Sequence, residues 1–252
     1  MICYNQDVKE GDMLEKLEKF QITILALIIA LGGMLSAKII TSAMAHDGIS
    51  VTGSAYEIVK SDSGKLYFNI CVQSKTKAAA YQLLKQQLPV VKKYLKEKGI
   101  EDITVKNYNG YYSYKYNQTT GNYTNEIENY KLSQPIEACS KDVNLIKEVS
   151  LDIQNLIDKG IDISEAGADY FYSGLSELKV KLLKEATIDA KNRASAMLKA
   201  NNNSVGKIQS VKMGVFQITS IDSTNVSDMG INDTSTIDKK VTAVANVVFK
   251  IK

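Results

Sequence analysis

The sequence predicts an α+β protein in which an N-terminal transmembrane helix precedes one domain of mainly antiparallel sheet packed with three helices. An uncharged apolar run near the N-terminus predicts the transmembrane helix. The domain is predicted from apolar periodicities that change between two and 3.6 residues, with turn residues between the segments. Their irregular order argues against a doubly wound parallel sheet. With 44% hydrophobic and 23% charged residues in 252, the chain is globular in composition.

The apolar run covers residues 20–37 and holds no charged side chain. At about 1.5 Å per residue it spans roughly 27 Å, and it extends to Ala45 if the Lys38 ammonium reaches the interface, enough for a ~30 Å hydrocarbon core. Lysines before the run predict a cytoplasmic N-terminus. The expected order is a cytoplasmic tail at 1–19, an anchor at 20–45 and an extracytoplasmic domain at 47–252.

A cleaved signal sequence is the competing interpretation, because Ala43-Met44-Ala45 fits a small-x-small cleavage site and would release a secreted or periplasmic domain. The leader at 1–19 argues against it, since its three lysines are outnumbered by five acidic residues. A buried helix of a soluble protein is the third interpretation. The first two place the domain outside the cytoplasm.

Strands are expected at residues 49–59 and 66–72, joined as a hairpin by a turn at 61–64. A helix at 76–98 ends at Gly99, and Pro89 is expected to kink it. The other expected elements are strands at 103–108, 130–138, 163–172, 207–219 and 240–251, a strand pair within 108–130, and helices capped by Ser140 and starting at Ser176.

Apolar stripes identify the buried faces of the last two helices. The expected stripes are Val143, Ile146, Val149, Ile153 and Ile157 in one, and Leu183, Ala186, Ala190, Ala194 and Met197 in the other. The small residues of the second stripe predict a helix that lies close on a sheet.

Several segments share their sequence with one known family. They are Ile49-Ser-Val-Thr-Gly53-Ser-Ala, Gly99-Ile-Glu-Asp-Ile, the tyrosine-rich strands, Ser140-Lys-Asp-Val-Asn, Gly160-Ile-Asp-Ile and Glu185-Ala-Thr-Ile-Asp-Ala-Lys-Asn-Arg-Ala194. On these, residues 49–251 resemble the SIMPL-domain family of bacterial periplasmic or membrane-anchored envelope proteins, which includes an immunogenic periplasmic protein. The resemblance implies an α+β fold, an extracytoplasmic setting and, in some members, a link to stress tolerance. It implies no catalytic residue, because the family has no agreed activity.

The sequence holds no motif for metal, cofactor or catalytic chemistry. Cys3, Cys71, Cys139 and His46 are scattered without the paired spacing of a zinc site. A net charge of +3 is too weak to indicate a nucleic-acid partner. We therefore expect no metal, no cofactor, no nucleic acid and no enzymatic activity, with an envelope hydrolase or transferase of unrecognised site as the alternative.

Seven of the 14 tyrosines fall between residues 108 and 130 and form the candidate interaction surface. Rings on strands suit plain sheet stabilisation, self-assembly or partner contact, and glycan or ligand binding. The candidate residues are Tyr108, Tyr111, Tyr112, Tyr114, Tyr116 and Tyr123. The resulting functional hypothesis is an envelope interaction or assembly module that forms a homo-oligomer or binds a protein partner.

Two residue pairs have structural interpretations. Arg193, the one arginine of the chain, lies one helical turn after Asp189, which predicts a structural ion pair, with a binding role as the alternative. Cys71 and Cys139 both fall on the polar face of strands, where they form either a disulfide or two separate thiols.

Overall fold

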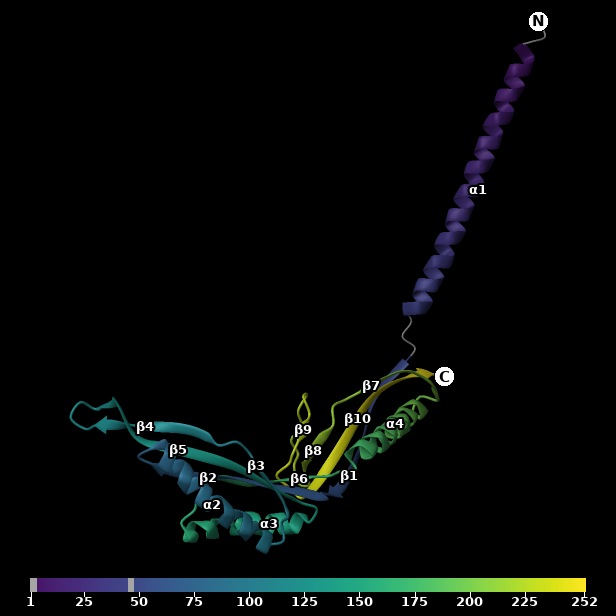
Figure 1. Ribbon diagram of the computed structural model, residues 1–252. Coiled ribbons are helices and arrows are strands. Elements are labelled where there is room, and N and C mark those ends of the chain that lie inside the picture. Colours follow the sequence, from purple (N-terminus) through teal and green to yellow (C-terminus); the bar gives the residue numbers. More distant parts are fainter. Residues whose placement is uncertain (1–3, 45–47) are drawn as a thin grey trace.

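The computed structural model describes residues 4–44 and 48–252. It consists of a long helix, α1 (Tyr4–Met44), and a domain in which three α-helices cover two five-stranded sheets (Figure 1). Strand pairs are antiparallel, except that β8 and β9 run parallel. The predicted α+β class, with its mainly antiparallel sheet and three domain helices, is confirmed.

Helix α1 contains a 21-residue apolar stretch, Phe20–Ile40, with a mean hydropathy of 2.2 and none of its length buried. A stretch of this length and composition is typical of a membrane anchor and also of a signal sequence. Residues 4–19, expected as a tail, continue the same helix. The cleavage point expected near Ala45 lies outside the described residues.

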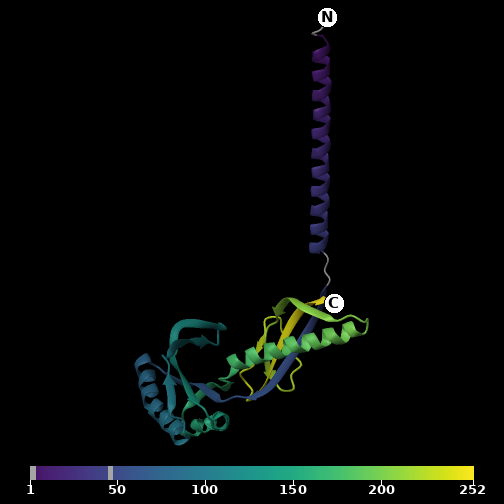
Figure 2. The same cartoon turned by 90° about the vertical axis from the view of Figure 1, so that its right-hand side faces the viewer.

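The first sheet joins the beginning and the end of the domain. Strand β1 (Gly48–Lys60) pairs with β10 (Asp238–Ile251) along its whole length. On its other side β10 pairs with β7 (Val205–Met213) and β8 (Gln217–Ser220), and β9 (Ile231–Asn232) follows β8. Helix α4 (Leu175–Lys199) lies along one face of this sheet (Figures 1 and 2).

The second sheet has the order β3 (Asp102–Val105), β5 (Asn122–Ser140), β2 (Ser63–Ser74) and β6 (Asp162–Phe171), and β4 (Asn109–Asn117) also pairs with β5. Helices α2 (Lys77–Glu97) and α3 (Val143–Asp152) pack on it, and α3 continues as the 3-10 helix η1 (Ile153–Lys159). Its core is fully buried and includes Leu66, Phe68, Ile70, Ile136 and Ile146.

The prediction that the first two strands form a hairpin is wrong. Strand β1 belongs to the first sheet, whereas β2 pairs with β5 and β6 in the second. Ser61 and Asp62 carry the chain from one sheet to the other. The strand that pairs with β1 is β10, which also has alternating apolar residues. Nothing in the sequence near β1 reveals so distant a partner.

Hydrogen bonds fix the junction between the two sheets. The Ser61 amide donates to the carbonyl of Ile237 at 2.9 Å, and the Tyr170 amide donates to the carbonyl of Thr234 at 2.7 Å. The Asp62 carboxylate accepts from the amide of Ser173 at 3.0 Å and from its hydroxyl at 2.5 Å. The Ser173 hydroxyl is the main cause of the lowered pKa of Asp62. The turn after β1 is thereby tied to the segment that enters α4.

Two strand boundaries differ from expectation. The segments expected as separate strands before and after Tyr130 form the single 19-residue strand β5. The strand expected at 207–219 is divided into β7 and β8, which pair with different stretches of β10. Strand β10 is long enough at 14 residues to hold both end to end.

The buried stripes of the later helices also differ in part. Ile157 is exposed and Leu156 is buried, because η1 has about three residues per turn and brings 156 under 153. The cap of α3 is Asp142, whose carboxylate accepts from two amides, whereas Ser140 accepts from the Asp142 amide. Met197 is exposed and Leu183 only half-buried. In α4 the buried line instead repeats every four residues: Leu178, Leu182, Ala186, Ala190, Ala194 and Leu198.

Helix α4 lies directly against the backbone of β1, as its small stripe predicts. A Cβ atom on Gly53 would overlap the carbonyl oxygen of Ala186 and the amide nitrogen of Ala190, and would lie 2.8 Å from the Ala190 Cα. The obstructing atoms are helix backbone, so they cannot move aside as a flexible side chain does. The helix and the sheet therefore fit only around a residue without a side chain.

We expect Gly53→Ala to lower the free energy of unfolding by about 2 kcal/mol, because the added methyl forces α4 away from the sheet. Urea denaturation of the full chain in detergent measures this change in the free energy of unfolding. Ser54→Ala is the matched control, since that side chain is exposed, and it should change the free energy by less than about 0.5 kcal/mol. Equal stability of Gly53→Ala and the unchanged chain would contradict the close packing.

A buried tyrosine joins α2 to the end of α3. The Tyr94 hydroxyl is close to the carbonyl (3.0 Å) and the carboxylate (3.1 Å) of Asp152, and Lys98 forms an ion pair with the same carboxylate. Burial and the Asp152 carboxylate raise the pKa of Tyr94 to about 12. The hydrogen bond from Lys98 is the main cause of the lowered pKa of Asp152.

The raised pKa makes the fold sensitive to alkali. In the unfolded chain Tyr94 ionises near the ordinary tyrosine pKa of 10.0, but in the fold only near 12, so its stabilisation is complete below pH 10 and is lost as the pH rises to about 12. We expect Tyr94→Phe to cost about 1 kcal/mol at neutral pH. Urea denaturation should be carried out at neutral pH and near pH 12. The loss of unfolding free energy caused by Tyr94→Phe should shrink or reverse at the higher pH. A constant deficit would contradict the shifted pKa.

Candidate functional site

The tyrosine-rich strands form a two-stranded ribbon that extends beyond the rest of the second sheet (Figure 1). Strand β4 pairs with β5 from Asn109 opposite Ser133 to Asn117 opposite Asn122. The pairing of β2 with β5 ends at Ser74 opposite Tyr130. Within the described residues, β5 from 122 to 129 therefore has β4 as its one partner. We call residues 109–129 the ribbon.

The rings on one face of the ribbon contact one another. Tyr112 meets Tyr114 at 5.3 Å between ring centroids and Tyr130 at 6.4 Å, both edge to face. Nearer the tip, Tyr116 meets Tyr123 at 5.2 Å. Edge-to-face geometry at these distances is the favourable arrangement for aromatic pairs. The ring contacts thus stabilise a hairpin on whose outer strand, β4, none of the described helices packs.

Most of the predicted tyrosine surface is brought together, but two of its residues lie elsewhere. Adjacent strand residues point to opposite faces, so Tyr111 lies on the other face from Tyr112. Tyr108 precedes the ribbon and packs at 5.7 Å on Tyr81 of α2. Tyr130 belongs to the same tyrosine-rich segment but is not one of the six named candidates, and the cross-strand register brings its ring to Tyr112. Tyr81 lies outside that segment and has no local signal in the sequence.

The clustered rings remain substantially accessible. Tyr116 is 54% and Tyr123 72% exposed, and Tyr112 is 51% exposed. A hydrogen bond with Tyr112 is the main cause of a raised pKa at Tyr114. On the ribbon, Lys115 and Glu126 form an ion pair at 2.7 Å, which lowers the pKa of Glu126. The ribbon therefore presents aromatic surface with few charged groups.

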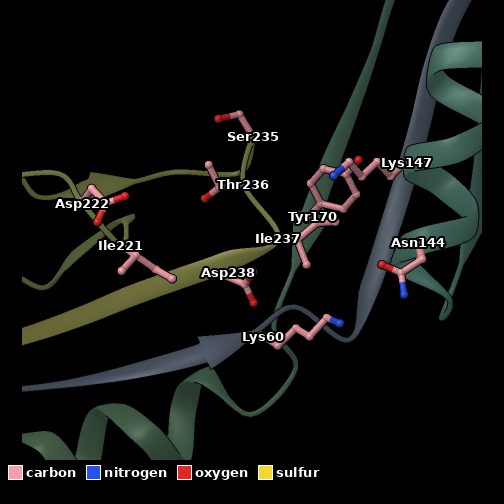
Figure 3. A pocket seen from close by; sticks show the side chains of 10 residues that line it. All are labelled: Lys60, Asn144, Lys147, Tyr170, Ile221, Asp222, Ser235, Thr236, Ile237 and Asp238. Carbon is pink, nitrogen blue, oxygen red and sulfur yellow. The ribbon is translucent and has the colours of Figure 1, made fainter.

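A polar hollow of about 490 Å³ lies at the junction of the two sheets (Figure 3). Its wall combines the end of β1, the start of α3, β6 and the loop before β10, with Lys60, Lys147, Asp222 and Asp238 as its charged groups. The hydroxyls of its Ser235 and Thr236 both donate to Asp233.

The Ser235 and Thr236 hydroxyls stabilise the loop to which they belong, because their acceptor, Asp233, lies in the same loop. Burial acts to raise the pKa of Asp233, but the hydrogen bonds from Thr236 and Ser235 outweigh it and leave the pKa below its ordinary value. Lys239, only 3% exposed, donates to the Asp233 carbonyl at 2.6 Å, and burial lowers its pKa. The polar groups beside the hollow thus hold the 233–239 loop in place, and we assign the hollow no chemistry.

Cys71 and Cys139 are free thiols and lie far apart, whereas Cys3 lies outside the described residues. Cys71 lies opposite Ser133 in the β2–β5 register, whereas Cys139 lies opposite Lys65. Six residues along a strand correspond to about 20 Å, well beyond the Cα separation that a disulfide allows. The structure therefore places them as two separate thiols. Burial is the main cause of the raised pKa of Cys139, so that thiol is not activated.

The predicted ion pair on α4 is present. The Arg193 Nε atom lies 2.8 Å from the Asp189 carboxylate. The same carboxylate accepts from the amide of Ser54 in β1 at 2.9 Å. The pair therefore ties the helix to the sheet beside Gly53, which supports its structural interpretation. In the described part of the chain, no three His, Cys, Asp or Glu side chains group in a way that could hold a metal ion.

Comparison with known proteins agrees with this fold. A search of the curated proteins gave no match. The SIMPL family model, described as "Protein of unknown function (DUF541)", matches residues 49–249, which cover both sheets except for the first residue of β1 and the last two of β10, and the three helices packed on them. The chain therefore belongs to the SIMPL family.

Proposed function

We propose that this chain is a membrane-anchored, non-enzymatic interaction module of the cell envelope, which assembles with a second copy through its ribbon. Helix α1 supplies the anchor through Phe20–Ile40, and the folded domain at 48–252 faces away from the cytoplasm. The observation that carries the proposal is the ribbon, where aromatic side chains and an open strand edge occur together.

The edge of β4 provides backbone groups for a partner. Strand β4 pairs with β5 on one side, and among the described residues no strand pairs with its other side. Such an edge is a template for strand addition unless charge or proline blocks it. Lys115 is the one charged residue of β4, and the strand contains no proline.

A second copy fits this edge by symmetry. Two identical edge strands that meet about a two-fold axis run antiparallel and present the same residues to each other. The exposed rings of Tyr112, Tyr114 and Tyr116 would then supply aromatic contacts beside the backbone hydrogen bonds. Figure 1 shows the ribbon remote from the start of β1, so the anchor does not cover it.

Protease accessibility tests the proposed location. In spheroplasts of a bacterial expression host, we expect external protease to degrade residues 48–252 without lysis and to leave an anchored N-terminal fragment. The reason is that α1 holds the N-terminus inside while the domain lies outside. A domain that resists protease until the spheroplasts are lysed would contradict this location.

Light scattering of the full chain in detergent, corrected for bound detergent, tests the assembly. We expect a protein mass of at least twice the 27.8 kDa chain, falling to one chain in Tyr112→Ser/Tyr114→Ser/Tyr116→Ser. Tyr111→Ser is the matched control on the opposite face and should keep the assembled mass. A single-chain mass for the unchanged protein at high concentration would contradict self-assembly.

A further inference from the structure

The segments that meet where β1 begins, namely the ends of α4 and β10 and the start of β7, carry mainly basic side chains. From residue 190 to 220 the sequence holds five basic residues and no acidic one. Residues 48–56 pair with residues 242–250, and these two segments together with residues 251–252 add two lysines and again no acid. The basic residues are Lys191, Arg193, Lys199, Lys207, Lys212, Lys250 and Lys252.

Four of these lysines converge on one end of the domain. Gly48, where the chain enters, lies opposite Lys250, and Ser204 exchanges backbone hydrogen bonds of 2.7 and 2.8 Å with Lys252. Helix α4 ends at Lys199 and β7 begins at Val205 beside them (Figures 1 and 2). We call Lys199, Lys207, Lys250 and Lys252 the basic end. All four are exposed.

The chain limits how far the basic end can lie from the anchor. Three residues, including one acid, Asp47, separate Met44 at the end of α1 from Gly48 at the start of β1. Four Cα-to-Cα steps span at most about 14 Å. If Phe20–Ile40 spans the bilayer, the remaining turn of α1 ends at its interface, so this end of the domain lies within reach of the headgroups.

Apolar side chains accompany the lysines at this end. Ile208 is 49% exposed and Ile251 is 39% exposed. Residues Val205 and Ile251 are paired in the last register of β7 and β10. Because side chains alternate along β10, Ile251 lies on the opposite face of the sheet from Lys250 and Lys252, and the two kinds of side chain meet at the end of the sheet. An end that carries both lysines and exposed aliphatic groups suits the interface of an anionic bilayer.

We propose that the basic end docks the domain on anionic lipid headgroups of the same membrane that α1 enters. The proposal rests on the anchoring part of the proposed function. The tether brings the lysines close to the headgroups, and their positive charge, which exceeds that of the one acid in the tether, holds the first sheet against the bilayer. The ribbon lies at the other end of the domain (Figure 1). Docking would therefore fix the direction in which the ribbon points away from the anchor.

The absence of tryptophan from the sequence permits a direct test. We expect the single tryptophan of Ile208→Trp, in the full chain reconstituted into phosphatidylcholine vesicles, to be quenched by a headgroup nitroxide more strongly when phosphatidylglycerol is included. Leu151→Trp, on α3 and 74% exposed, is the control position and should show no such difference.

Charge variants in the Ile208→Trp background identify the lysines. Lys207→Gln/Lys250→Gln/Lys252→Gln should abolish the extra quenching, because each lysine near an anionic surface changes the docked-to-free ratio about fivefold. Lys77→Gln/Lys85→Gln/Lys92→Gln on α2 removes the same charge elsewhere and should retain it. Salt near 1 M, where the screening length is about 3 Å, should also abolish the extra quenching caused by phosphatidylglycerol.

Flotation of salt-washed vesicles separates the two proposals. A chain that does not float with the vesicles overturns the anchor and the docking together. Docking alone is overturned by a chain that floats but whose introduced tryptophan is quenched equally with and without phosphatidylglycerol. Equal quenching before and after the Lys207, Lys250 and Lys252 substitutions has the same consequence.

Discussion

The pairing of β1 with β10 is the constraint on which the rest of the structure depends. It joins the two ends of the domain over thirteen consecutive registers, from Gly48 opposite Lys250 to Lys60 opposite Asp238. The sheet so formed can accept α4 only because Gly53 leaves room for the helix backbone. The Asp189 carboxylate then bonds the Ser54 amide next to that contact and holds Arg193 at the same time. One strand pair, one glycine and one carboxylate thus position the first sheet and its helix.

Local sequence patterns predicted those features of the fold that depend on neighbours along the chain. Helix α2 begins directly after Thr76, and Gly99 follows its end with φ 93°, close to the predicted bounds of 76–98 and the predicted stop at Gly99. The same patterns failed where a distant partner decides the outcome. The turn residues after β1 resemble a hairpin, yet they lead from one sheet to the other because β10 occupies the edge that β2 would need. The exposed Ile157 shows a third limit, since the change from α- to 3-10 geometry has no mark in the apolar pattern.

The candidate site shows the same division. Composition alone drew attention to the tyrosines, and alternation along a strand was enough to expect rings on an open face. Which rings meet depends on register, and the two shifts in the β4–β5 pairing, at Ser113/Tyr114 and Tyr114/Tyr116, are not visible in the sequence. Tyr81 joins Tyr108 from a helix about 27 residues earlier, which only the packed fold reveals. The spacing of Cys71 and Cys139 likewise becomes decisive only once the strands are aligned.

The β1–β10 pairing also sets the order of events during biogenesis. A chain that is synthesised from its N-terminal end exposes β1 first, and β10 follows about 200 residues later. Contacts this distant in sequence form slowly, because closing so long a loop costs entropy before any strand pairing offsets it. Until then Val51 and Val59 lack the β10 side chains that pack against them in the folded domain. The second sheet, whose strands lie between β1 and β10 in the chain, can form in that interval, so the first sheet is the last part of the domain to become native.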